Sequence, residues 1–326
     1  MAAKDVTLYY FPSSYFSLKA LLALYEKNIP FKKRIVNMFA SEQNENWYLK
    51  MNRNGEVPVL ELDGEYIAES EVIIDVIDHT FTSGSILVPD LETKRGQEVR
   101  EFRMLLDNIP IGIVTFGVLA NRQFCIEDIT SPLFGFDRKR TEQYMQGSYN
   151  KLLQKKKSCP PELIPVIERK IELNRKRYES ILSESEVAKA LDELEQDFDK
   201  LAARLEQSKR DAEDAQEYWL IGTSFTAADI TATILMFRLR LIGVAPRYLS
   251  SEKRPIVHEY YNRIMKRPSI QEIVDINNST SSYVYKQTVK FYGKKALKIG
   301  LVLGLVAIGY AGYREYSKIH RGLAKA

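Results

Sequence analysis

The stretch NGEVPVLELDGEYIAESEVIIDVI, residues 54–77, predicts a β-hairpin that leads directly into a helix. Its apolar run VPVLEL is typical of a buried strand, and the dipeptide Asp63-Gly64 is a strong signal for a tight hairpin turn. The segment EYIAE should then return as an antiparallel strand. From Ser70 onward the apolar residues change to helical spacing, so we expect a helix there.

The chain before this stretch alternates strands and helices. The β-branched and aromatic run Val6–Phe11 predicts a strand, and the sequence PSSY separates it from an amphipathic helix. The run Phe31–Val36 predicts a second short strand, and NENWYLKMN predicts a polar helix. This order, completed by the hairpin and its helix, predicts a thioredoxin-like α/β domain at residues 1–85.

From Thr93 to about residue 278 the periodicity is helical, which predicts a second, all-α domain at residues 93–278. Its first long helix should be kinked at Pro110. Residues 126–183 are rich in Lys and Arg, contain the break SCPP, and predict an inserted basic helical region. Such a region favours a surface for protein partners.

A later helix begins with Ser183 and Glu186, which have the spacing of a capping box. Its apolar stripe follows alternating steps of four and three, so it predicts either packing on its own domain or a coiled-coil seam. The stripe comprises Val187, Leu191, Leu194, Phe198, Leu201 and Leu205.

Charge separates the end of this 326-residue chain from the rest. Nine Lys or Arg and one Glu beyond residue 283 give that segment a charge of +8, which leaves −4 for the remainder of a chain of net charge +4. A basic tail that encloses an apolar run favours a membrane surface over nucleic acid. Two cysteines without a framework and three scattered histidines predict neither disulfides nor a metal site, and the sequence MAAKDVTLYYF predicts no secretory signal.

The apolar run Ile299–Tyr313 carries no charge and predicts a transmembrane tail anchor over residues 296–313. At about 1.5 Å per residue, these residues span roughly 27 Å, enough for a thin bilayer. Residues 279–298 would form a basic juxtamembrane segment and residues 314–326 a short basic end. A buried core helix is the alternative. Basic flanks on both sides favour the mitochondrial outer membrane or the peroxisomal membrane, with the bulk of the protein in the cytosol.

Two motifs resemble those of the cytosolic glutathione transferase superfamily over roughly residues 5–275. They are VPVL, followed by ES eleven residues after its proline, and YWLIGTSFTAADI, residues 218–230. The resemblance implies a glutathione site in which the Val57–Pro58 bond is cis and the backbone of Val57 pairs with the extended peptide. Glu69 and Ser70, at the start of a helix, would hold the γ-glutamyl carboxylate. In the second motif Thr226 and Asp229 form a capping box, a structural feature.

The resemblance also implies a hydroxyl that stabilises the glutathione thiolate, and Ser14 is the best-placed candidate. Ser14 has a second, structural interpretation as the N-cap of the first helix. Other hydroxyls in this region are Tyr9, Tyr10, Ser13 and Ser17. Arg53 stands where the superfamily usually has proline, and Leu21 replaces the usual basic residue of the first helix, with Lys19 nearby. These departures favour weak or absent transferase activity.

The long insertion, the apolar C-terminal segment and the sequence RPIVHEYYNRIMKRPS together resemble the ganglioside-induced differentiation-associated protein 1 family. Members of that family are tail-anchored, glutathione transferase-like proteins of the mitochondrial outer membrane. The resemblance implies a role in mitochondrial shape, including fission and organelle contacts, with weak or vestigial glutathione binding and a homodimer as the candidate assembly. The alternative is an active glutathione transferase that detoxifies electrophiles at the same membrane.

Overall fold

The structure, a computed structural model, describes residues 4–129, 137–212 and 218–279. Residues 1–278 form one unit and residues 279–326 a second. The predicted juxtamembrane segment beyond residue 279, the transmembrane tail at 296–313 and the basic end at 314–326 lie outside the described residues.

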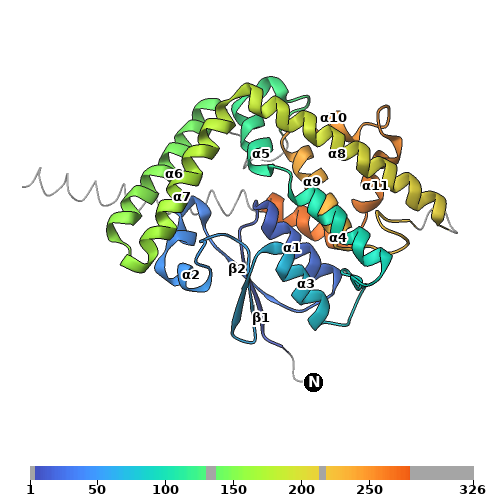
Figure 1. The fold of residues 1–326 in the computed structure, drawn as a ribbon, viewed down its shortest axis with the longest axis horizontal. Helices are drawn as coiled ribbons and strands as arrows, with labels where there is room; N and C mark the ends of the chain where they lie inside the picture. Colours follow the sequence, from blue (N-terminus) through green and yellow to red (C-terminus); the bar gives the residue numbers. More distant parts are fainter. Residues whose placement is uncertain (1–3, 130–136, 213–217, 280–326) are drawn as a thin grey trace, which may run out of the picture. The chain divides into compact units, whose positions relative to one another are not determined.

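The N-terminal part is built on a four-stranded sheet (Figure 1). Its strand order is β2-β1-β3-β4, with β2 parallel and β3 antiparallel to β1, which confirms the predicted thioredoxin-like order. The elements are β1 (Val6–Tyr10), α1 (Tyr15–Glu26), β2 (Lys32–Ile35), the 3₁₀ turns Met38–Ala40 and Glu42–Asn44, α2 (Asn46–Met51), β3 (Val59–Leu62), β4 (Glu65–Ala68) and α3 (Ser70–Thr80).

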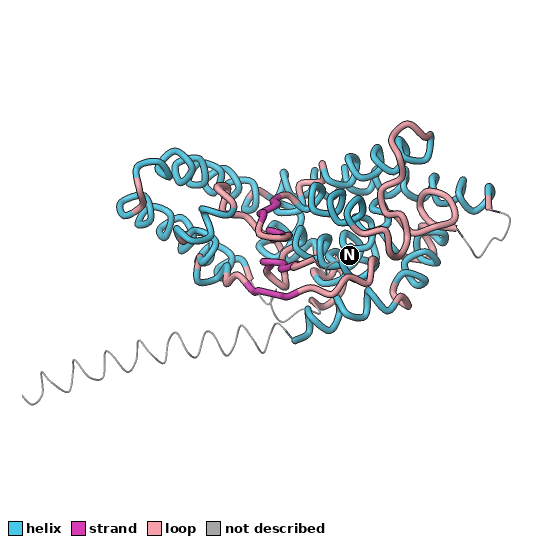
Figure 2. Tube along the Cα trace, turned by 90° about the horizontal axis from the view of Figure 1, so that it is seen from below, coloured by secondary structure: helices cyan, strands magenta, loops and turns pink. Residues whose placement is uncertain are grey.

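The predicted hairpin turn joins β3 to β4. Asp63 and Gly64 both have positive φ, 52° and 88°, as a type I′ turn requires. Leu62 pairs with Glu65 and Val59 with Ala68, so the two strands are in register over their full length. Figure 2 shows the strands gathered in one place among the helices. The hairpin therefore delivers the chain directly to the first residue of α3.

The second part of the described chain is helical, and its helices α6 and α7 form a hairpin (Figure 1). Its elements are α4 (Lys94–Asp107), α5 (Ile111–Ala120), the 3₁₀ turn Arg122–Phe124, α6 (Arg138–Ser158), the 3₁₀ turn Pro161–Leu163, α7 (Ile164–Leu182), α8 (Glu184–Asp211), α9 (Ala227–Leu241), α10 (Ala245–Leu249), α11 (Pro255–Ile264) and a helical stretch at residues 268–279.

The kink expected at Pro110 is a complete break between α4 and α5. Proline has no N–H to continue the helix, and it disfavours the helical conformation at the residue before it. The amide of Ile111 instead bonds the carbonyl of Ile109 at 2.7 Å. Within the described residues one stretch, Lys94–Ala120, has the length and apolar composition of a membrane span. This break interrupts it, and half of its apolar window is buried inside the protein.

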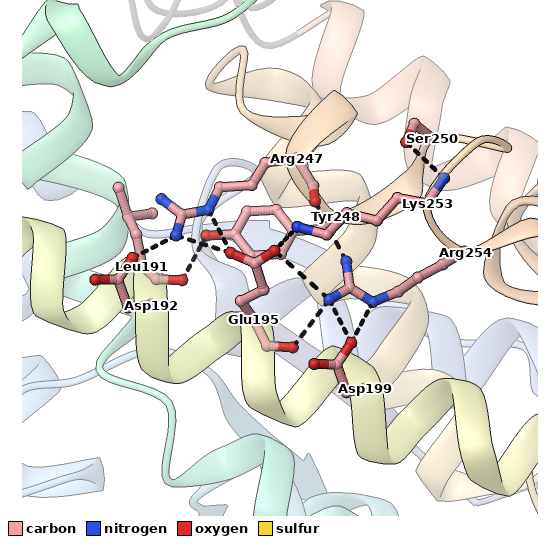
Figure 3. Close-up of polar contacts among 9 residues, drawn as sticks. All are labelled: Leu191, Asp192, Glu195, Asp199, Arg247, Tyr248, Ser250, Lys253 and Arg254. Atoms are coloured by element: carbon pink, nitrogen blue, oxygen red, sulfur yellow. Dashed lines mark hydrogen bonds and ion pairs between the residues drawn. The ribbon is translucent and has the colours of Figure 1, made fainter.

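The stripe on α8 packs on its own domain. All six of its apolar residues are buried in the main hydrophobic core, which leaves no seam open for a coiled-coil partner. The Ser183 hydroxyl caps the helix by accepting the amide of Glu186 at 3.4 Å. On its polar side α8 binds α10 and the start of α11 through an ion-pair network, in which Arg247 pairs with Glu195 at 2.9 Å (Figure 3).

The predicted capping box of α9 is confirmed and organises the helical domain. The fully buried Asp229 carboxylate accepts the Thr226 amide at 2.8 Å and the Thr226 hydroxyl at 2.9 Å. It also accepts the Leu220 amide at 2.9 Å and the Tyr260 hydroxyl at 2.6 Å. Burial raises the pKa of Asp229, an effect that these hydrogen bonds oppose. One carboxylate thus joins a loop, α9 and α11.

Candidate functional site

The register of the sheet brings the predicted site residues to one end of the N-terminal domain. Tyr9 pairs with Val59, and Val59 pairs with Ala68. The end of β1, the start of β3 and the end of β4 therefore lie beside one another. The loop that holds Ser14, the Val57–Pro58 bond and the start of α3 each follow or precede these strand ends.

Ser14 is the N-cap of α1. Its Oγ accepts the amide of Ser17 at 3.3 Å, and the Ser17 hydroxyl accepts the amide of Phe11 at 3.2 Å. From the helical domain, the buried Arg238 donates to the carbonyl of Ser13 at 2.6 Å. Burial lowers the pKa of Arg238 to about 10. Ser14 therefore caps α1, as its structural interpretation predicted. Because the Ser14 Oγ only accepts in this hydrogen bond, its proton remains available to a ligand.

The neighbouring tyrosines are less suited to activate a thiol. The Tyr9 hydroxyl already donates to the carboxylate of Glu61 at 2.9 Å. Burial, together with that carboxylate, raises the pKa of Tyr9 to about 12. Tyr10 is buried in the hydrophobic core. Among the hydroxyls considered from the sequence, Ser14 remains the candidate at the start of α1.

The Val57–Pro58 peptide bond is cis, as the resemblance implied. The turn before it is braced, because the Tyr48 hydroxyl and the Asn52 side-chain amide both donate to the carbonyl of Glu56, at 2.8 and 2.9 Å. Neither the amide nor the carbonyl of Val57 has a hydrogen-bond partner within the described residues. Paired backbone groups are the rule inside proteins, so this open pair is suited to an extended peptide ligand.

Glu69 and Ser70 form the entry to α3. Glu69 has φ 68°, an uncommon conformation for a residue with a side chain and one that concentrates at functional sites. Ser70 is the first residue of α3 and is 6% exposed. The first amides of a helix lack intrahelical partners and carry partial positive charge. The two residues therefore stand at a place suited to a carboxylate.

An ionic cluster centred on the buried side chains of Lys19 and Arg103 adjoins this entry. The Lys19 side chain, fully buried on α1, pairs with Glu71 of α3 and, at 2.5 Å, with Asp107 of α4. Arg103 of α4 binds Glu71 at 2.5 Å and Asp75 at 2.6 Å. Burial favours protonation of Glu71, but Lys19 and Arg103 outweigh it and hold the pKa of Glu71 below its usual value. Burial raises the pKa of Asp107 to about 6 despite Lys19.

Lys170, on α7, reaches the turn that precedes Val57. Its ammonium donates to the carbonyls of Asn54 at 2.6 Å and Gly55 at 2.8 Å. Burial lowers the pKa of Lys170 to about 8, while Glu56 opposes the shift. Sequence reasoning missed this residue, because more than a hundred positions separate it from the turn and no local pattern marks the contact. The same reasoning noted Lys19 without its buried partners.

No group of three or more His, Cys, Asp or Glu in the described ranges is placed to hold a metal ion. Cys125 and Cys159 are free thiols. The open backbone of Val57 and the first amides of α3 are suited to an extended, anionic peptide, and the Ser14 hydroxyl lies at the start of α1.

Comparison with known families agrees with this geometry. Residues 8–85 match the sequence model of the glutathione S-transferase N-terminal domain, and residues 170–268 match that of the C-terminal domain. The crystal structure of the beta-etherase LigF from Sphingobium sp. superposes with a TM-score of 0.62 at 24% identity, covering 83% of this chain and 99% of LigF. The protein therefore has the glutathione transferase fold.

Ganglioside-induced differentiation-associated protein 1-like 1 of Homo sapiens is 25% identical over 321 residues, 96% of this chain and 86% of the human protein. The Mus musculus counterpart is also 25% identical, over 324 residues, with the same coverage. The chain belongs to the ganglioside-induced differentiation-associated protein 1 family. Protein LigF of Sphingobium is 28% identical over 280 residues, 82% of this chain and 92% of LigF.

The ionic cluster predicts a pH dependence of stability that one variant should remove. Asp107 has an ordinary pKa of 3.8 and a folded value of about 6, so between these values the folded state holds a proton that the unfolded state has released. The free energy of unfolding should therefore fall as pH rises from about 4 to about 6. In Asp107→Asn residue 107 cannot titrate, so this variant should lack the fall in the free energy of unfolding. Urea unfolding at several pH values, followed by tryptophan fluorescence, would measure the difference.

Lys19→Met is the contrasting variant. It leaves the half-buried Asp107 carboxylate without its cation and Glu71 with Arg103 alone, so it should destabilise the protein by about 3 kcal/mol at pH 7. An unchanged pH profile in Asp107→Asn would show that this carboxyl does not carry the proton of the cluster.

Proposed function

We propose that the protein is a membrane-anchored, glutathione transferase-like regulator of mitochondrial network shape, acting in fission and organelle contacts, with weak or vestigial glutathione binding. The observation that carries the proposal is the similarity to the human family member over 96% of this chain. That similarity extends beyond the two transferase domain matches, which leave residues 86–169 unmatched between them.

The binding part of the proposal rests on three groups at one end of the sheet, namely the Val57 backbone, the start of α3 and the Ser14 hydroxyl. The backbone of Val57 would pair with the cysteinyl unit of glutathione, and Ser70 with the first amides of α3 would hold the γ-glutamyl carboxylate. Glu69 would lie beside the ligand's amino group. The thiol would face the start of α1, where Ser14 carries the free hydroxyl proton.

The anchoring part rests on the sequence of residues 296–313, with the mitochondrial outer membrane as the site and the peroxisomal membrane as a second. In this proposal the cytosol-facing body meets protein partners through the inserted region at residues 126–183. Proteins of the glutathione transferase fold commonly form homodimers, and we extend that assembly to this chain. Nucleic acid has no part in the proposal.

The second candidate function is an active glutathione transferase that detoxifies electrophiles at the outer membrane. The observation in its favour is Ser14, because its Oγ accepts the Ser17 amide and can still donate its proton to a thiolate.

Ser70→Ala tests the carboxylate site. Loss of a buried hydrogen-bonding group should weaken glutathione binding by about 1–3 kcal/mol, measured by calorimetric titration of the full chain in detergent. Ser183→Ala is the matched control, because Ser183 also stands at the start of a helix but caps α8. No detectable binding by the unmodified protein at millimolar glutathione would contradict the proposed site.

Ser14→Ala separates capping from catalysis. Under the main proposal the variant should lose about 1 kcal/mol of stability, the usual worth of an N-cap, with no transferase activity to lose. Ser14→Thr, which keeps a hydroxyl, should retain most of that stability. Melting temperatures and conjugation of glutathione to an aryl chloride would be measured together. Substantial conjugation that disappears in Ser14→Ala at unchanged melting temperature would favour the enzyme.

Leu305→Arg tests the anchor. A charge near the centre of a spanning helix costs about 2.5–3.5 kcal/mol on insertion scales, and the proposed helix is short. The variant should move to the cytosol, which imaging with an N-terminal fluorescent tag would show, whereas Leu305→Ile should stay on mitochondria. Leu305→Arg protein that resists carbonate extraction from mitochondria would contradict a transmembrane anchor.

A further inference from the structure

The hairpin of α6 and α7 is fastened to the N-terminal domain by three lysines. Lys151 donates to the carbonyl of Phe39 at 2.7 Å, and Lys155 pairs with Glu45 at 3.3 Å. Lys170 donates to the carbonyls of Asn54 and Gly55. All these partners lie in one segment, residues 39–55, which leads into the cis Val57–Pro58 bond.

Lys170 differs from Lys151 and Lys155 because it binds the turn directly before Val57. The carbonyls of Asn54 and Gly55 are bound by Lys170, and the next carbonyl, of Glu56, is bound by Tyr48 and Asn52. Every carbonyl of this three-residue turn therefore has a partner from within the protein. The amide and the carbonyl of the following residue, Val57, have no partner within the part of the chain that the structure describes.

Gly55 shows how closely the ammonium approaches the turn. Its φ is +57°, and a Cβ added there would lie 2.7 Å from Lys170 Nζ and 2.7 Å from the carbonyl oxygen of Gln43. A side chain at this position would thus push the lysine away and strain the backbone. Gly55 thus leaves the space that the ammonium of Lys170, from the helical domain, occupies.

We propose that Lys170 is a positioning residue of the candidate glutathione site, holding the turn Asn54–Glu56 so that the Val57 amide and carbonyl face an extended peptide ligand. This inference rests on the proposed glutathione binding. It makes the α6–α7 hairpin, which reaches residues 39–55 through these lysine bonds and the Phe39–Tyr144 ring contact at 5.8 Å, a determinant of ligand affinity. Because coupling is reciprocal, ligand binding should in turn stabilise the hairpin's attachment.

The charged groups that act on Lys170 are Glu56, which favours its protonated form, and Arg177, which disfavours it. With a pKa of about 8, the ammonium loses its charge over an experimentally accessible range. Charged donors bond carbonyls more strongly than neutral ones, so the hold on the turn should weaken as pH rises through that value.

The test compares three full-chain variants in detergent. Lys170→Met removes the donor, and Lys151→Met is the matched control, because it removes an equal charge and the carbonyl contact to Phe39 from the same hairpin. Lys170→Arg keeps the charge at all pH values used. Hydrogen exchange of the Gly55 amide, which bonds the carbonyl of Asn52 at 2.9 Å, reports the turn without any ligand. Affinity is measured from pH 6.5 to 9 with S-methylglutathione, whose blocked thiol does not titrate.

Lys170→Met should exchange the Gly55 amide about 10-fold faster and bind S-methylglutathione about 10-fold more weakly, the range expected for a lost charged hydrogen bond. Lys151→Met should match the wild type in both. Wild-type affinity should fall between pH 7 and 9, and Lys170→Arg should flatten that fall. Equal exchange in Lys170→Met and Lys151→Met would overturn the role of Lys170. Faster exchange in Lys170→Met with no ligand binding by the wild type would overturn the proposed glutathione site and not the hold on the turn.

Discussion

The structure depends on one buried charge, the ammonium of Lys19. Its side chain is fully buried, and the carboxylates of Glu71 and Asp107 compensate its charge. These partners come from α3 and α4, so a single side chain joins the two helices that pack on the N-terminal sheet to the first helix of the second domain. The starts of α1 and α3, where Ser14 and Ser70 stand, are held side by side by this pairing.

In the candidate site, some polar groups have hydrogen-bond partners within the protein and others do not. The carbonyls of the turn 54–56 are all bonded by the protein, and Ser14 is engaged as a cap. The backbone of Val57 and the entry to α3 are the open positions. Under the proposed function, this arrangement would favour recognition over turnover, because it would offer a peptide ligand partners along its length and, near its thiol, a Ser14 hydroxyl that also caps α1. The fold by itself does not assign a function.

The local features of this fold could be predicted from the sequence because each is decided by neighbouring residues. Asp63 and Gly64 take the positive φ that a tight hairpin needs, and Thr226 and Asp229 close the capping box across three residues. Contacts between distant residues could not be predicted. In the sequence, Lys170 is one of several basic residues on an amphipathic helix, and no neighbouring residue in the chain indicates its contact with Gly55. Pro110 was expected to bend a helix, whereas the structure shows that it ends one.

The most direct test of peptide binding at the Val57 backbone is an NMR titration of the full chain, labelled with ¹⁵N at valine, with reduced glutathione. The Val57 amide has no partner within the described residues, whereas Val59 is paired inside the sheet. We predict that the Val57 resonance shifts progressively and saturates at millimolar glutathione, while the Val59 resonance stays in place. A Val57 resonance that does not move at saturating glutathione would contradict the claim that this backbone is the peptide-binding edge of the protein.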